Sequence, residues 1–161
     1  MADAEHHQNE PVIEALNGLI ATEMVAVNQY FLHAKILESR GLERLAKHFR
    51  DDSLDEMRDL EALMDRVLYL GGLPNLQYLE GFQVGESVTE QLRLAFELER
   101  SAIGQLKDAV AVCLTANDEG SAELLRPMIP SEEDQLDWLR TQLDLIESLG
   151  EANYLAQQLY P

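Results

Sequence analysis

The sequence predicts an all-α protein: a bundle of four long helices, with one long crossover between helices 2 and 3 and a short fifth helix at the C-terminus. Two observations predict this fold. Apolar residues recur every three or four positions along four long stretches, which is the pattern of helices that bury one face. The segment 71–86 has no such period and contains five glycines or prolines.

The first two helices cover about 9–39, starting at Asn9 or Pro11, and about 42–70, and the glycines that follow each of them stop it. Each apolar stripe contains one acid, Glu23 in the first helix and Glu56 in the second. The first stripe consists of Val12, Leu16, Leu19, Ile20, Val27, Phe31 and Ala34, and the second of Leu45, Phe49, Leu60, Leu63 and Val67.

The segment 71–86 is long enough to return the chain to the other end of the bundle. Extended at ~3.3 Å per residue it reaches ~50 Å, which is about the length of the helix before it. We therefore expect helices 2 and 3 to be parallel, as in four-helix bundles with one crossover. The third helix covers about 87–115, opens with a capping box from Ser87 to Glu90, and carries Glu99 in its apolar stripe.

The fourth helix covers about 117–149 and contains two prolines. Because Pro127 and Pro130 each remove a backbone hydrogen bond, we expect a break or strong kink between 126 and 131, with Ser131 capping the restart. Glu132 and Gln135 lie on the core side of the restarted helix. The last segment, 151–160, is expected to form a fifth helix that needs neighbours, such as other subunits, to pack against.

Composition and charge narrow the class of protein. The 161 residues fit one domain, which we place at 10–161 behind a flexible tail at 1–9. The formal net charge of −18 argues against nucleic acid or an anionic membrane as partner and favours cations. A lone cysteine, Cys113, excludes a disulfide within the chain and fits a reducing compartment. With no long apolar stretch in the sequence, we expect no membrane span and a cytoplasmic protein.

One acidic residue lies on the apolar face of each long helix: Glu23, Glu56, Glu99 and Glu132. A buried carboxylate costs several kcal/mol unless it is paired or binds a metal. Only 12 basic residues are present to pair with them, and Lys35, Lys47, Arg66 and Lys107 lie off the apolar stripes that carry these acids. The set therefore predicts a dinuclear carboxylate metal site, with a polar network or a weak cation site as the alternative.

Two of the four acids have a polar residue three positions later, on the same helix face. Ferritin-like di-iron bundles carry Glu-x-x-His at such positions, but this sequence has Asp59 after Glu56 and Gln135 after Glu132. Asp59 retains a carboxylate that can ligate a metal. Gln135 offers only a neutral amide oxygen, and the loss of both imidazoles shifts the site toward harder or more loosely held cations.

At about 12–155 the sequence resembles the bacterioferritins of the ferritin-like superfamily. The resemblance rests on the segments EMVAVNQYFLHA (23–34), LDEM (54–57), GLPNLQ (72–77) and DWL (137–139). It implies a ferritin-like bundle, a hollow 24-subunit shell and iron stored inside as a ferric mineral. By this match the four glutamates occupy carboxylate positions of a ferroxidase centre, and Asp59 and Gln135 replace its two histidines. Asp51 and Asp55 occupy the position of an inner-surface iron site.

The resemblance also implies haem b, bound between two-fold-related subunits by the methionine at position 57 of each. Helix geometry is consistent with this, because Met57 is about 100° from Glu56 and therefore off the core face, where a self-complementary interface can supply both ligands. Some bacterioferritins divide the work between a ferroxidase subunit and a haem subunit, and this chain resembles the second. A ferroxidase-competent sister subunit and a reductase or ferredoxin would then be its partners.

Three functions remain open from the sequence. The first is a haem-bearing iron-storage subunit whose ferroxidase site is impaired. The second is an active ferroxidase that oxidises Fe(II) to Fe(III) at a di-iron centre, made of Glu23, Glu56, Asp59, Glu99 and Glu132. The third is a structural shell component that binds neither metal nor haem. Of the remaining residues, Tyr30, His33 and Trp138 are expected to pack in the core, and His48 to lie at the surface.

Overall fold

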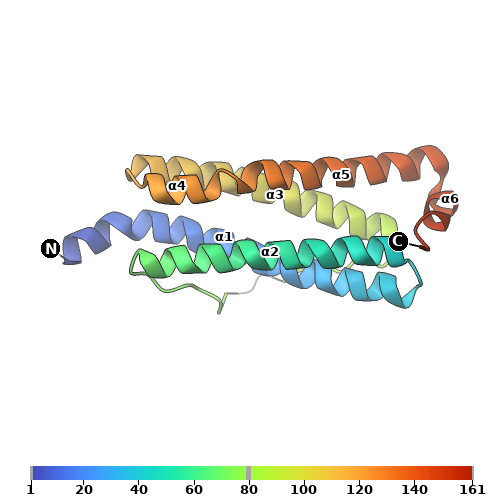
Figure 1. Cartoon of the computed structure of the whole chain (residues 1–161), viewed down its shortest axis with the longest axis horizontal. Helices are drawn as coiled ribbons and strands as arrows, with labels where there is room; N and C mark the ends of the chain where they lie inside the picture. Colours follow the sequence, from blue (N-terminus) through green and yellow to red (C-terminus); the bar gives the residue numbers. More distant parts are fainter. Residues whose placement is uncertain (1, 79–80, 161) are drawn as a thin grey trace.

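The computed structural model describes residues 2–78 and 81–160, and for residues 2–8 it describes the backbone alone. Helices are the only regular secondary structure in this part of the chain, and four long rods form the bundle (Figure 1). Helices α1 and α2 pair side by side and antiparallel, and α3 packs against the rod made by α4 and α5. The helices are α1 (Ala2–Ser39), α2 (Glu43–Tyr69), α3 (Val88–Thr115), α4 (Glu119–Leu125), α5 (Met128–Leu149) and α6 (Glu151–Ala156).

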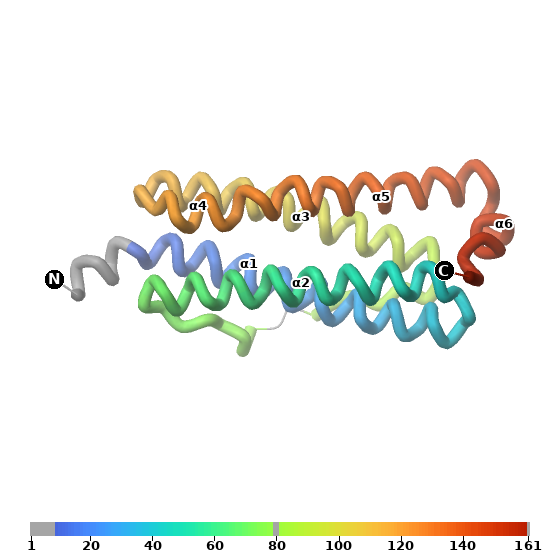
Figure 2. The backbone as a smooth tube through the Cα atoms, in the orientation of Figure 1, coloured from blue at the N-terminus to red at the C-terminus, as the bar shows by residue number. Residues whose placement is uncertain are grey.

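The connection between α2 and α3 returns along the bundle, so that α2 and α3 run parallel (Figure 2). This confirms the crossover predicted for 71–86. Two glycines bound it: Gly71 has a φ of 82°, which L side chains rarely adopt, and a Cβ at Gly85 would lie 2.6 Å from the Gln91 backbone nitrogen. The predicted capping box is present, with the Ser87 hydroxyl accepting from the Glu90 amide.

The fourth rod is broken where the prolines predict it. α4 ends at Leu125, and α5 begins at Met128, directly after Pro127. The prediction that Ser131 caps the restart was wrong, because Pro130 lies within the first turn of α5, where its missing N–H is one of the groups without an intrahelical partner anyway. Glu132 is therefore on regular helix, and the prolines do not displace it.

Two boundaries and one core residue differ from the sequence-based expectation. α1 begins at Ala2 rather than at Asn9 or Pro11, since acidic residues near a helix start favour its extension, and the C-terminal helix α6 ends at Ala156, short of the predicted end at 160. Phe31 is 51% exposed, so its assignment to the core was wrong. Tyr30 and Ala34 are buried in the core at this level, whereas Phe31, about 100° round the helix from Tyr30, lies on the exposed side.

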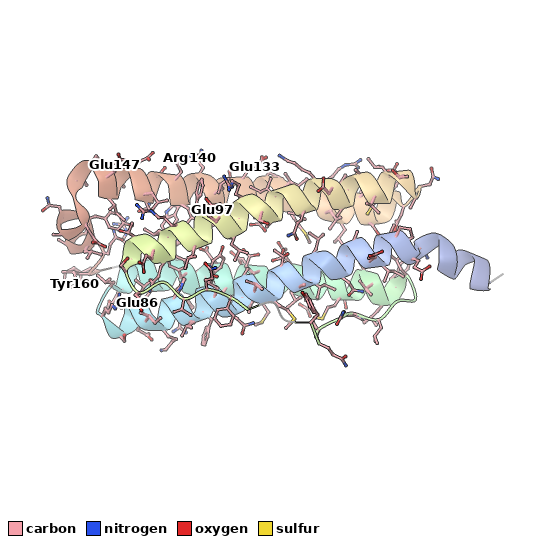
Figure 3. The ribbon with its side chains drawn as sticks, turned by 180° about the vertical axis from the view of Figure 1, so that it is seen from behind. Glu86, Glu97, Glu133, Arg140, Glu147 and Tyr160 are labelled. Carbon is pink, nitrogen blue, oxygen red and sulfur yellow. The ribbon has the colours of Figure 1, made fainter. Side chains whose placement is uncertain are left out.

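The buried core consists of two separate apolar clusters, one toward each end of the bundle. On α1 the boundary between them falls after Ile20 and before Ala26, and corresponding gaps occur on α2, α3 and α5. Each gap contains one of the four glutamates identified from the sequence. The middle of the bundle is therefore a polar layer between two apolar ones. The other acidic positions of the rods are mostly at the surface, as Figure 3 shows for Glu133.

Candidate metal centre

The four glutamates of the polar layer are buried, with 2 to 6% of each side chain exposed: Glu23, Glu56, Glu99 and Glu132. Carboxylate oxygens of Glu23, Glu56 and Glu132 all lie within 4.8 Å of one another, although they come from three helices. Carboxylate oxygens this close to one another can ligate a shared cation. The prediction that the four rods send their acids to one interior place is consistent with this geometry.

Among the side chains that the structure describes, no basic group is paired with the layer, and none of the ion pairs involves any of the four glutamates. The acids instead bond to one another: Glu56 donates to Glu23, and Glu99 donates to Glu132. The Tyr30 hydroxyl donates a further hydrogen bond to Glu99. Without a metal, the layer therefore has to retain protons.

Burial and mutual repulsion explain this retention. Burial raises the pKa of Glu23 from its ordinary 4.5 to about 8, with repulsion by Glu132 and Glu99 adding to the effect and the hydrogen bond from Glu56 opposing it. Burial also raises the pKa of Glu99 and of Glu132. A cation of high charge can replace these protons, since metal binding to carboxylates releases them.

A pocket of about 200 Å³ leads from the layer toward the surface between α2 and α5. Its walls include Glu56 and Glu132 from the layer, and also Asp59 and Gln135, the two residues predicted to replace histidines. Burial raises the pKa of Asp59 from 3.8 to about 6, and repulsion by Glu132 adds to this. Asp59 thus lies beside the three clustered carboxylates but outside that group.

Gln135 lines the pocket, and its amide nitrogen has two partners on α2. That nitrogen donates to Asp52 and lies 3.3 Å from Nε2 of His48. His48, predicted to lie at the surface, is partly covered: its ring stacks on Trp138 with the ring centroids 3.4 Å apart, and 27% of the side chain is exposed. Sequence reasoning missed both His48 and Asp52, although spacings of four residues place them on the helix face of Glu56.

The two predicted inner-surface residues are exposed and paired locally. Asp51 forms an ion pair with Lys47, and Asp55 with Arg58, one turn or less away on α2. Asp55 also reaches the wall of the pocket, whereas Asp51 does not line it. Their predicted role in iron binding stays a prediction.

Met57 lies off the core face, with 50% of its side chain exposed. Leu54, three residues earlier on α2, and Phe31 on α1 are exposed to a similar degree. A hydrogen bond from the Ser53 hydroxyl to the Val27 carbonyl fixes the two helices at this level. The sulfur is therefore accessible from outside the subunit, as its position in the sequence predicts.

Comparison with known proteins decides the family. The model of the ferritin-like domain family matches residues 13–149, which include all four buried glutamates. The chain belongs to the ferritin-like family. Within the described residues, no helix combines the length and the apolar composition that a membrane crossing requires.

Among the ferritin-like proteins, the chain is similar over most of its length to several bacterioferritins. It is 47% identical over 150 residues to a bacterioferritin of Streptomyces coelicolor, which covers 92% of this chain and 90% of that protein. It is 41% identical over 151 residues to a bacterioferritin of Mycobacterium leprae (93% and 95%) and 37% identical over 148 residues to one of Brucella melitensis (91% and 92%). The resemblance stated from the sequence is confirmed, and the chain is a member of the bacterioferritins.

Proposed function

We propose that this chain is an iron-storage subunit that takes up Fe(II) at the buried carboxylate layer and contributes haem to a 24-subunit shell. The observation that carries the metal part is the cluster of Glu23, Glu56 and Glu132 without a basic partner. Carboxylates held this way gain most from a divalent or trivalent cation, because it removes both their repulsion and their desolvation cost.

We further propose that oxidation of Fe(II) by this chain alone is slow. Ligand nitrogens suit iron, and the positions equivalent to the family's histidines hold Asp59 and Gln135. Gln135 can offer only a neutral amide oxygen in place of an imidazole nitrogen, while its amide nitrogen donates to Asp52. A sister subunit with both histidines would supply the oxidation step, in a mixed shell.

An active ferroxidase is the second candidate, and one observation favours it. Three carboxylates already lie within 4.8 Å of one another, and Asp59 lines the same pocket. The di-iron centre would then be held by oxygen ligands alone, in place of the family's set of glutamates and histidines. These ligands would come from Glu23, Glu56, Asp59, Glu99 and Glu132.

Stopped-flow absorbance after mixing Fe(II) with the aerobic, purified protein separates the two candidates. The proposed function predicts slow oxidation without a saturable rapid phase. A rapid phase that saturates at about two Fe(II) per subunit, the capacity of a two-metal site, and that disappears in Glu23→Ala would establish the ferroxidase instead.

For haem, the residues present fit the group. Met57 presents a thioether that its own subunit leaves half exposed, and Leu54, about one turn away on the same helix, is an exposed apolar side chain. Thioether ligation raises the potential of a haem, which suits electron transfer. Electrons delivered by a reductase or ferredoxin could then reduce ferric mineral for release.

Haem content per subunit after reconstitution, read from the absorbance spectrum, tests this role. Met57→Ala should lose the haem, whereas Met24→Ala, a change of the same kind on α1, should retain it. Equal haem content in the two variants would remove Met57 as a ligand and would favour a purely structural subunit.

A further inference from the structure

Three polar atoms converge in the wall of the pocket, and none of them belongs to the four buried glutamates. Nε2 of His48 lies 3.1 Å from Oδ2 of Asp52 and 3.3 Å from the amide nitrogen of Gln135. The same amide nitrogen donates to Asp52. His48 and Asp52 are one turn apart on α2, and Gln135 reaches them from α5, so the group joins two of the four rods.

We propose that His48, Asp52 and Gln135 form a second cation position, with Nε2 of His48 as its nitrogen ligand. The ions it takes are divalent first-row transition metals. This inference rests on the proposed function in one respect, namely that Fe(II) would be the ion passing from here to the carboxylate layer.

The imidazole is held in place for this role. Its ring stacks on Trp138 with an interplanar angle of 19° and meets the edge of Phe49 at 84°. Packing on two sides fixes the ring plane and directs Nε2 toward Asp52, which is the arrangement that metal ligands need. Since 27% of the His48 side chain and 13% of Asp52 are exposed, ions can reach the pair from solvent.

The donor set matches the proposed ions. Imidazole nitrogen together with carboxylate oxygen binds zinc and ferrous iron. When the Gln135 amide hydrogens point at both neighbours, Nε2 of His48 is an acceptor, and its lone pair is the one that a metal would use. A half-turn of the Gln135 amide replaces its nitrogen by its oxygen, which would supply a third ligand without moving the helix.

The second position is connected to the layer. His48, Asp52 and Gln135 line the same pocket as Asp59 and Glu132. Asp52 is near enough for its charge to act on Glu132, whose pKa is raised mainly by burial. Positions 59 and 135 lack an imidazole, but one is present at position 48, about three helical turns from Asp59 along α2.

Zinc is a suitable probe, because it does not oxidise and accepts both nitrogen and oxygen ligands. Crystals of the full-length protein would be soaked with Zn²⁺ and measured at the zinc absorption edge. We expect an anomalous peak at about 2.0–2.2 Å from Nε2 of His48 and from Asp52, separate from any peak among Glu23, Glu56 and Glu132. Calorimetric titration should give about one Zn²⁺ per subunit fewer in His48→Gln.

Two variants keep the test decisive. His48→Gln removes the nitrogen ligand, and Asp52→Asn removes the carboxylate while it leaves the stack on Trp138 intact, so both should lose the outer peak and retain the inner one. Asp137→Asn removes an exposed carboxylate of α5 and should retain both peaks.

The outcomes separate this inference from the proposed function. Zinc in the carboxylate layer alone, or an outer peak unchanged in both variants, overturns the second position and leaves the proposed function standing. Zinc at His48 alone supports the second position and contradicts uptake at the layer. Zinc at neither place overturns both.

Discussion

The Tyr30 hydroxyl donates a hydrogen bond to Glu99 at the centre of the bundle, and the tyrosine is completely buried. The bond ties α1 to α3 at the level of the polar layer. It is also the one contact of Glu99 that lowers its pKa, against burial and the hydrogen bond with Glu132, which raise it. A satisfied core tyrosine was expected at this position from the sequence.

Replacing Tyr30 by phenylalanine should therefore destabilise the protein. The change leaves a buried acceptor without its donor, which costs about 1–3 kcal/mol. The free energy of unfolding in denaturant measures this. Tyr160→Phe, at a position 77% exposed, should have no measurable effect, and an equally small effect of Tyr30→Phe would show that the bond contributes nothing.

Removing one charge from the polar layer should stabilise the metal-free protein. In Glu132→Gln a neutral amide replaces a buried acid that has no basic partner, and a gain of about 1–3 kcal/mol in the free energy of unfolding is expected near pH 7.5. The matched control is Glu133→Gln, which alters an exposed ion pair with Lys107 and should change stability by less than about 0.5 kcal/mol. Similar effects of the two changes would contradict the account.

The metal-free protein should lose stability as the pH rises from about 5 to 8. The folded state raises the pKa of Glu23 from 4.5 to about 8 and of Asp59 from 3.8 to about 6, so it holds protons that the unfolded chain releases in this range. The stabilisation is complete below the unfolded pKa and is lost as pH rises through the folded one, at up to about 1.4 kcal/mol per pH unit for each proton.

Thermal unfolding at a series of pH values checks this. With Zn²⁺ or Mn²⁺ added the trend should reverse, because ions bind the deprotonated carboxylates. A melting temperature of the metal-free protein that rises steadily to pH 8 would show that the layer does not retain its protons.

Restoring histidine at both replaced positions should accelerate Fe(II) oxidation. Imidazole ligands suit iron better than the oxygen ligands present, and changes in a metal's ligand environment alter activity by about 10–100-fold. The double variant Asp59→His with Gln135→His should therefore oxidise Fe(II) at least about tenfold faster in stopped flow. The control Asp65→His places a histidine on the exposed face of α2. An unchanged rate in the double variant would show that these positions do not limit the reaction.

The sequence predicts the four inward acids because helical period alone places a residue on a face. The same period predicts the orientation of Met57, and the missing backbone N–H of proline predicts the broken fourth rod at Pro127. Sequence patterns do not predict contacts that depend on how two helices pack against each other. His48 and Asp52 share the face of Glu56 by spacing, yet their role depends on the approach of Gln135 and Trp138 from α5, which no local pattern reports.

Errors at the ends of helices have a similar origin. Ser131 is a good capping residue, but Pro130 is tolerated in a first turn, so the helix starts earlier at Met128.

Phe31, in the middle of α1, satisfies the apolar period of that helix and is nevertheless exposed, which a subunit interface would explain.

Anaerobic calorimetric titration with Fe(II) tests the central claim, that the buried carboxylates bind iron, most directly. We predict saturable binding in the natural protein. The ions held by the carboxylate layer are lost from it in Glu56→Gln, a change within the layer, and the full binding is retained in Glu61→Gln, an exposed position on the same helix. Equal Fe(II) binding by both variants would contradict the account.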